Sequence, residues 1–297
     1  MRILVIGVGR IGGGLVYELM QRGDCTILLY GRDFTRTSGM AADFRELNTS
    51  VEVLVLEHLR DLPPIDLTVF SFSQLVWHSE LLVNGRIIDA RTNIAIIDSI
   101  ASQVSLKTLG PIILLSNPPD ILSRYCYEKY GADNVYGFGN SLDELRVKNT
   151  LIQMQLPQNG KECICLGEHG AGMVPVLSKV FNDKELDHAL YDKINSAVFG
   201  RIHQIIHQAY IPLYGPLFAL KELVLAIINK ETKQVTLSCY LDKDYLGQRN
   251  LSMGVPVELN AGVLSKIVDV EVSDFEKELF AQSAKSLEAQ YQQVVSK

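Results

Sequence analysis

A histidine, an aspartate and an arginine in the second half of the chain could together move a proton and hold an anion. His169 stands in a glycine-flanked loop, shortly after a predicted strand over residues 162–166. An imidazole titrates near neutral pH, so it can donate a proton in one direction of a reaction and accept one in the other. It needs a carboxylate to fix its tautomer and stabilise the imidazolium, and Asp143 is the candidate.

Arg146 follows Asp143 by three residues on a predicted helix, and this spacing puts both side chains on one side of the helix. A guanidinium binds a carboxylate through two parallel hydrogen bonds, so Arg146 is the candidate for binding a substrate carboxylate. Each residue also has a purely structural explanation. Asp143 and Arg146 can form a local ion pair, and His169 can be a buried histidine with its hydrogen bonds satisfied.

The elements that must position this chemistry begin with the first twenty residues. Residues 3–6 are a short apolar run typical of a buried parallel strand, and a G-x-G-x-x-G turn and an amphipathic helix follow. This order predicts a site for a dinucleotide pyrophosphate, because the glycines allow a tight turn, a close approach to the phosphates and close packing of helix on strand. The helix N-terminus attracts the anion. The cofactor-binding residues predicted in this turn are Gly7, Gly9, Arg10, Ile11 and Gly12.

The end of the second predicted strand, residues 26–30, bears on the choice of cofactor. An NAD site has an acidic residue here that binds the ribose 2′-hydroxyl, but this chain has Gly31 and Arg32. Arg32 can face a 2′-phosphate, which favours NADP(H). NAD(H) stays open, since Arg32 can equally be a solvated arginine while Asp33 reaches the ribose.

Strands and helices alternate through the first half of the chain. Helices are expected from Gly39 and over residues 86–104. Further buried strands are expected over residues 51–56, 67–72, 112–116 and 134–138. This order predicts an α/β fold, a Rossmann-type doubly wound parallel sheet, in a dinucleotide-binding domain over residues 1–142.

The second half has a different pattern and is expected to be an α+β substrate domain over residues 143–297. A long helical region over residues 185–230 contains Pro212 and Pro216, which should kink it. An antiparallel meander and a C-terminal helix follow, and Ser273 and Glu276 form a capping box at the start of that helix. The three strands of the meander are expected over residues 234–241, 253–259 and 262–270.

Taken together, these motifs resemble the L-lactate/malate dehydrogenase family, the L-2-hydroxyacid dehydrogenases of Rossmann type. The resemblance covers nearly the whole chain, and LDxxR followed by GEHG is its most specific part. The matching stretches are IGVGRIG at 6–12, G-x-x-x-D-F at 39–44, SNPPDIL at 116–122, NSLDELR at 140–146, LGEHGAGMVPV at 166–176 and MGVPVELNAGVLSKIV at 253–268.

The resemblance implies a role for each matching residue. His169 matches the proton donor and acceptor, Asp143 its partner, and Arg146 the arginine that binds the substrate carboxylate. Asn117 matches an asparagine beside cofactor and substrate, and Arg86 matches the arginine that polarises the reacting carbonyl. The implied reaction is reversible hydride transfer between a nicotinamide cofactor and a 2-oxo acid, with a homodimer or homotetramer as the assembly.

The segment over residues 73–85 matches the family's lid but departs from it. Malate enzymes carry an arginine in this lid, whereas this segment contains no arginine or lysine. Its length resembles that of L-2-hydroxyisocaproate dehydrogenase. Because a dicarboxylate requires a second cation, we expect a 2-oxo acid with an apolar side chain. The segment is largely apolar and contains Gln74, Leu75, Val76, Trp77, Leu81, Leu82 and Val83.

Two alternatives stay open. The first is an L-lactate or malate dehydrogenase with an unusual lid. The second is a non-catalytic dinucleotide-binding sensor, which would need the glycine turn alone. Four residues argue against a sensor: Arg86, Asp143, Arg146 and His169.

Composition limits the remaining classes of function. The net charge is −6 without a block of lysine or arginine, so no nucleic-acid or membrane surface is expected. Five cysteines, an odd number, favour reduced thiols and a cytoplasmic protein, and no apolar run reaches membrane-spanning length. No metal site is expected, since His203 and His207 lack further ligands at suitable spacing.

Overall fold

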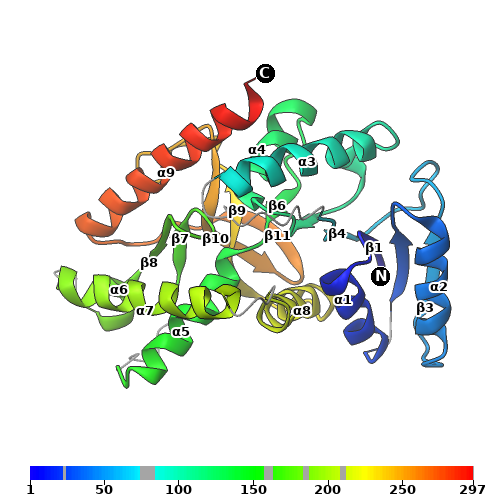
Figure 1. Ribbon diagram of the computed structural model, residues 1–297, viewed down its shortest axis with the longest axis horizontal. Helices are drawn as coiled ribbons and strands as arrows, with labels where there is room; N and C mark the ends of the chain where they lie inside the picture. The colour runs from blue at the N-terminus through cyan, green and yellow to red at the C-terminus, as the bar shows by residue number, and fades with distance from the viewer. Residues whose placement is uncertain (23–24, 74–83, 157–162, 183–186, 208–211, 297) are drawn as a thin grey trace. The chain divides into compact units, whose positions relative to one another are not determined.

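The structure is a computed structural model that describes residues 1–22, 25–73, 84–156, 163–182, 187–207 and 212–296. The chain divides into two compact units, which are described separately (Figure 1). The first unit comprises residues 1–138 with 289–297, and the second comprises residues 139–288. The domain boundary predicted before Asp143 falls just inside the second unit and stays a prediction.

The first unit contains a six-stranded parallel sheet. Its strand order is β3-β2-β1-β4-β5-β6, and each neighbouring pair is parallel. The strands are β1 (Arg2–Ile6), β2 (Thr26–Tyr30), β3 (Glu52–Leu56), β4 (Leu67–Phe70), β5 (Ile112–Leu114) and β6 (Val135–Gly137). The predicted Rossmann-type doubly wound sheet is confirmed, because the order reverses between β1 and β4.

Four α-helices of the first unit lie among these strands in the described part of the chain. They are α1 (Arg10–Met20), α2 (Phe34–Arg45), α3 (Asn84–Ala101) and α4 (Pro119–Tyr130), with a short 3₁₀ helix at Leu106–Thr108. Helix α2 begins five residues before Gly39, because the Asp33 carboxylate caps it by accepting a hydrogen bond from the Arg36 N–H at 2.9 Å. Helix α4 begins at Pro119, where the sequence indicated a turn. Proline suits this first position, since no N–H is needed there.

Helices α3 and α4 lie side by side and are joined through the carboxylate of Asp98 (Figure 1). Tyr130 donates a hydrogen bond to it at 2.6 Å, Lys129 at 3.0 Å and Tyr125 at 2.8 Å. Burial alone would raise the pKa of Asp98, but these hydrogen bonds outweigh it and hold the pKa below its usual value.

The second unit contains an antiparallel sheet of order β9-β10-β7-β8, with β11 also paired to β10. Its strands are β7 (Cys165–Gly167), β8 (Met173–Pro175), β9 (Lys233–Tyr240), β10 (Ser252–Asn260) and β11 (Val263–Ile267). The predicted meander is therefore confirmed as β9-β10-β11. Strand β8 was not predicted, because it has only three residues.

The helices of the second unit are α5 (Asn140–Gln153), α6 (Leu177–Phe181), α7 (His188–His207), α8 (Tyr214–Ile228) and α9 (Asp274–Val295), whose last turns belong to the first unit. The long helical region is two helices, α7 and α8. Pro216 lies in the first turn of α8, where a proline is tolerated, so it does not kink a helix. Among the helices of the described residues, none is both long and apolar enough to cross a membrane.

The capping box of α9 is confirmed and reaches further than predicted. The Glu276 carboxylate, which is buried, accepts hydrogen bonds from the N–H and hydroxyl of Ser273 at 2.8 and 2.9 Å. It also accepts hydrogen bonds from the N–H and hydroxyl of Ser178 on α6. One carboxylate therefore caps α9 and ties it to α6.

Candidate active site

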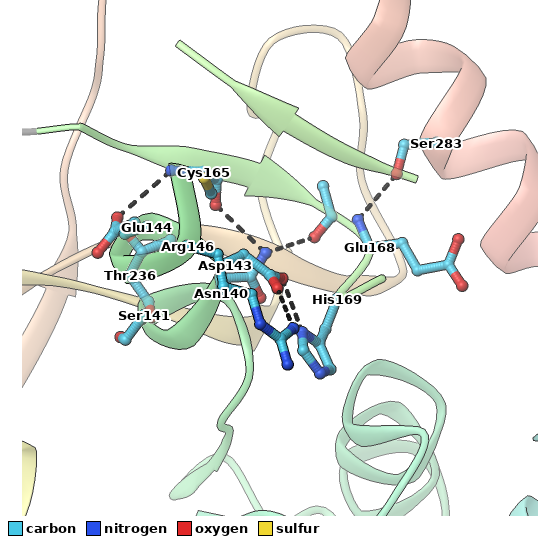
Figure 2. Close-up of polar contacts among 11 residues, drawn as sticks. Asn140, Ser141, Asp143, Glu144, Arg146, Cys165, Glu168, His169, Thr236 and Ser283 are labelled. Atoms are coloured by element: carbon cyan, nitrogen blue, oxygen red, sulfur yellow. Dashed lines mark hydrogen bonds and ion pairs between the residues drawn. The ribbon is translucent and has the colours of Figure 1, made fainter. Parts of the chain in front are cut away.

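The structure brings together three of the residues predicted to do chemistry, all in the second unit. Helix α5 supplies Asp143 and Arg146, and the loop after β7 supplies His169 (Figure 2). Asp143 is fully buried and uses one carboxylate oxygen for each partner. Its Oδ2 lies 2.7 Å from Nδ1 of His169, and its Oδ1 accepts a hydrogen bond from Nη1 of Arg146 at 3.0 Å.

This arrangement defines what each group can do. A carboxylate at 2.7 Å from Nδ1 places the proton of a neutral His169 ring on that nitrogen, so Nε2 is the ring nitrogen that can exchange a proton with a substrate. Asp143 also stabilises the imidazolium when the ring is protonated. Among the described residues, only Asp143 is hydrogen-bonded to the guanidinium of Arg146. The fork of Arg146 therefore has donors left for a carboxylate ligand.

The local ion pair suggested as a purely structural explanation for Asp143 and Arg146 is thus present. It does not account for the site alone, because the same carboxylate also holds His169. A buried carboxylate shared between an arginine and a histidine is a costly arrangement for the fold, and it is typical of a functional site.

Gly139 is a site residue that the sequence analysis missed. A Cβ at this position would lie 2.2 Å from Cγ of His169, far inside normal contact, so the imidazole rests directly against the backbone of Gly139. Gly139 is also the N-cap of α5, the helix that supplies Asp143. No signal in the local sequence separates this glycine from an ordinary helix-capping one.

The glycine turn of the first unit lies between the ends of β1 and β4, at the point where the strand order reverses. The Ser71 N–H donates to Ile6 O at 2.9 Å and the Ser71 hydroxyl to Gly7 O at 2.8 Å. Gly7 has a φ of +96°, and a Cβ at Gly12 would lie 2.3 Å from Gly7 O, so the fold itself requires both glycines.

Gly9 is different, because a Cβ there would meet no atom of the described chain within 4 Å. Gly9 is also the N-cap of α1 and offers no side-chain cap to the first turn of that helix. A helix N-terminus thus stands beside a glycine that the packing of the described residues does not require. This cradle fits a dinucleotide pyrophosphate. Arg10 and Ile11 open α1 directly after it.

The end of β2 explains why an acidic residue is missing there. A Cβ at Gly31 would lie 2.2 Å from Oγ1 of Thr37, and this hydroxyl donates to Asp33 O at 2.7 Å. An aspartate at position 31 would therefore displace Thr37. Asp33 and Arg32 are both exposed, but Asp33 already has a structural task as the cap of α2.

The remaining two predicted residues belong to the first unit. Arg86 lies in the first turn of α3, and its side chain is outside the described part of the structure. Asn117 follows β5, and its carbonyl accepts a hydrogen bond from Nδ2 of the buried Asn93 at 2.8 Å. Asn93 lies seven residues after Arg86 on α3. The apolar lid residues predicted at 74–83 lie outside the described residues.

Comparisons with known proteins are consistent across the chain. Residues 140–297 match the family model described as "lactate/malate dehydrogenase, alpha/beta C-terminal domain". The chain is 33% identical over 193 residues to the malate dehydrogenase of Natronomonas pharaonis, a match that covers 61% of this chain and 62% of that protein. It is 27% identical to the L-lactate dehydrogenase of Mesomycoplasma hyopneumoniae, over 99% of this chain and 98% of that one.

Solved structures show the same fold. The lactate dehydrogenase of Cryptosporidium parvum, complexed with lactic acid and β-nicotinamide adenine dinucleotide, superposes with a TM-score of 0.82 at 20% identity. The match covers 100% of this chain and 98% of that one.

Proposed function

Because this chain belongs to the lactate/malate dehydrogenase family, we propose that it is an NAD(P)-dependent L-2-hydroxyacid dehydrogenase with His169 as its acid and base. The predicted family, and with it the oxidoreductase class, is confirmed by the model match and by relatives that align over nearly the whole chain. The observation that carries the proposed site is the buried Asp143 carboxylate, with one oxygen on His169 and the other on Arg146. A dinucleotide sensor has no use for this triad.

In the proposed reaction, Arg146 binds the carboxylate of a 2-oxo acid through its guanidinium fork. His169 donates its Nε2 proton to the carbonyl oxygen as that oxygen becomes an alkoxide, and Asp143 stabilises the imidazolium until the proton has left. A bound reduced nicotinamide supplies the hydride that reaches C2. In the reverse direction, His169 accepts the hydroxyl proton. Arg86, by its match to the family, is assigned to the developing charge on the oxygen, and Asn117 to cofactor and substrate.

For the substrate we propose a 2-oxo acid with an apolar side chain. The support is the lid sequence, which lacks the cation that a second carboxylate requires. The competing assignment, L-lactate or malate dehydrogenase, is favoured by the names of the relatives. The two assignments predict opposite results with oxaloacetate as the substrate, so an assay can distinguish them.

For the cofactor we propose NADP(H), with NAD(H) as the alternative. Gly31 is held to a glycine by Thr37, so no carboxylate side chain stands at the end of β2 to bind a ribose 2′-hydroxyl. Arg32 is the exposed cation next to that position. Following the family, we further propose a homodimer or homotetramer in the cytoplasm.

The experiment that tests the function follows oxidation of NADPH and of NADH with pyruvate, oxaloacetate and 4-methyl-2-oxopentanoate. We expect turnover, fastest with 4-methyl-2-oxopentanoate. We expect His169→Ala to lose about 10²- to 10⁴-fold in rate while it still binds the cofactor, because general acid catalysis contributes about that much. Failure to turn over any of the three acids would refute the proposed activity, and exclusive use of oxaloacetate would refute the apolar substrate. Retained reduction by His169→Ala would refute the role of the histidine.

A further inference from the structure

A buried asparagine on the first turn of α5 holds the strand that leads to His169. The side chain of Asn140 is fully buried, and its Nδ2 donates to Cys165 O at 3.2 Å and to Gly167 O at 3.1 Å (Figure 2). Its Oδ1 accepts no hydrogen bond from the described part of the chain. The side chain therefore acts on the described residues through one nitrogen, which bridges two carbonyls of β7.

Those two carbonyls lie on the edge of β7 that pairs only briefly with β10 in the described residues. Carbonyls alternate in direction along a strand, and Ile164 O, between β7 and its neighbour β8, accepts from the Val176 N–H at 2.8 Å. The carbonyls of Cys165 and Gly167 face the other way, toward β10. The described register between β7 and β10 consists of one pair, Gly254 opposite Gly167. At this short pairing the Asn140 amide adds a side-chain donor that reaches both carbonyls.

The middle of β10 is shaped to receive this amide. A Cβ at Gly254 would lie 2.1 Å from Nδ2 of Asn140 and 2.3 Å from its Cγ. Gly254 lies between the fully buried residues Met253 and Val255, in a strand interior where glycine is unfavourable. The close approach of Asn140 accounts for a glycine at this point.

We propose that Asn140, seated on Gly254, is a positioning residue for His169. Gly167, whose carbonyl Asn140 holds, lies two residues before His169, and Asp143 lies one helical turn after Asn140. Helix α5 thus contacts one short segment at two points. Asn140 donates to Gly167 O, and the Asp143 carboxylate contacts Nδ1 of His169. Because both contacts come from a single helix, the hydrogen bond of Asn140 to Gly167 sets the position of the imidazole relative to Asp143. The inference rests on the proposed function, in which His169 transfers the proton.

The test measures hydride transfer in a single turnover, with reduced cofactor and the best 2-oxo acid, in four variants. We expect Asn140→Ala and Gly254→Ala each to slow transfer by about 10- to 100-fold, since a misplacement of about 1 Å can cost about 10²-fold. Steady-state kinetics of the same variants should give a KM for the 2-oxo acid close to that of wild type, because the guanidinium of Arg146 is hydrogen-bonded to Asp143 on its own helix. The double variant should be no slower than the slower single variant, because both changes remove one contact.

Ser141→Ala is the matched control. Ser141 is the next residue of α5, and its hydroxyl donates to Thr236 O on β9 at 2.7 Å, so this variant loses the same kind of bond without touching β7. We expect its transfer rate to stay within about twofold of wild type. An equal loss in Ser141→Ala would mean that the seating of α5 matters in general, and would overturn the role of Asn140.

Three other results would overturn the inference: a wild-type rate in Asn140→Ala, a wild-type rate in Gly254→Ala, or multiplied losses in the double variant. If Asn140→Ala does not fold, Gly254→Ala alone carries the test, because it displaces the amide without removing it. A wild-type protein that reduces no 2-oxo acid would refute the proposed function instead, and this control separates the two failures.

Discussion

Gly139→Ala is a small change that should disable the proposed acid–base group, His169, without replacing it. The added Cβ would lie 2.2 Å from Cγ of His169 and 2.6 Å from its Nδ1, whereas ordinary contact begins at 3.4 Å. The ring would have to retreat by ~1.2 Å. A shift of that size lengthens the 2.7 Å contact between Nδ1 and Asp143 beyond hydrogen-bond range or turns the ring away from it.

The expected result is a loss in kcat of about 100-fold, or about 2.7 kcal/mol of transition-state stabilisation, because proton transfer depends on a position held to within about 1 Å. The KM for the 2-oxo acid should stay within about threefold of wild type, since the Arg146 fork lies on the next turns of α5. Steady-state kinetics with the best 2-oxo acid measure both constants, and fluorescence titration measures cofactor binding, which should not change.

Gly200→Ala is the matched control within the same unit. Gly200 lies inside α7, and a Cβ there would meet no atom of the described chain within 4 Å. This variant should keep full activity and gain roughly 0.5–1 kcal/mol of stability, because alanine is the better helix former. Wild-type kcat in Gly139→Ala would refute the claim that the imidazole rests on the backbone of Gly139. An equal loss in both variants would show that the assay reports on general damage.

Three further predictions concern the cofactor and the fold. Arg32→Asp should lower kcat/KM for NADPH by about 10-fold or more relative to NADH, as loss of one charge-assisted hydrogen bond implies; Arg22→Asp controls for net charge, and an unchanged cofactor ratio would exclude a contact with the 2′-phosphate. The lowered pKa of Asp98 means that its carboxylate stabilises the fold above about pH 3.9 and that this contribution is lost as the pH falls below that value. In Asp98→Asn the melting temperature should therefore fall less than in wild type as the pH is lowered from 6 to 3. An equal fall in the two proteins would contradict the assignment. Glu276→Ala should lower the free energy of unfolding, measured in urea, by roughly 3 kcal/mol, because it leaves buried donors without their acceptor. Glu278→Ala on the exposed face of the same helix should lower it by less than about 0.5 kcal/mol.

The parallel sheet of the first unit could be predicted because its signals are local. An apolar run such as residues 3–6 is followed directly by a glycine, and a continuous apolar run of this length is typical of a parallel strand buried on both faces. The start of α2 was missed for a local reason too. Asp33 could either cap the helix or bind the ribose, and the sequence alone does not show which of these two roles its carboxylate has.

The same distinction between local and long-range signals applies to the candidate site. Asp143 and Arg146 could be paired from their spacing, because a helix brings residues three apart together. The contact of His169 with Asp143 spans 26 positions and depends on the path of β7, so residue types and the family resemblance suggested it while local pattern did not.

Gly139 and Gly254 could not be identified as site residues from the sequence at all. A glycine is usually explained by what its own backbone must do, and neither of these two has a positive φ. Their reason lies in a side chain that arrives from elsewhere in the chain, the imidazole of His169 in one case and the amide of Asn140 in the other. The space left by a missing Cβ is thus part of how the candidate site holds His169. It follows that alanine at either glycine should impair the chemistry more than it impairs folding, which a comparison of kcat with melting temperature in the same variants will decide.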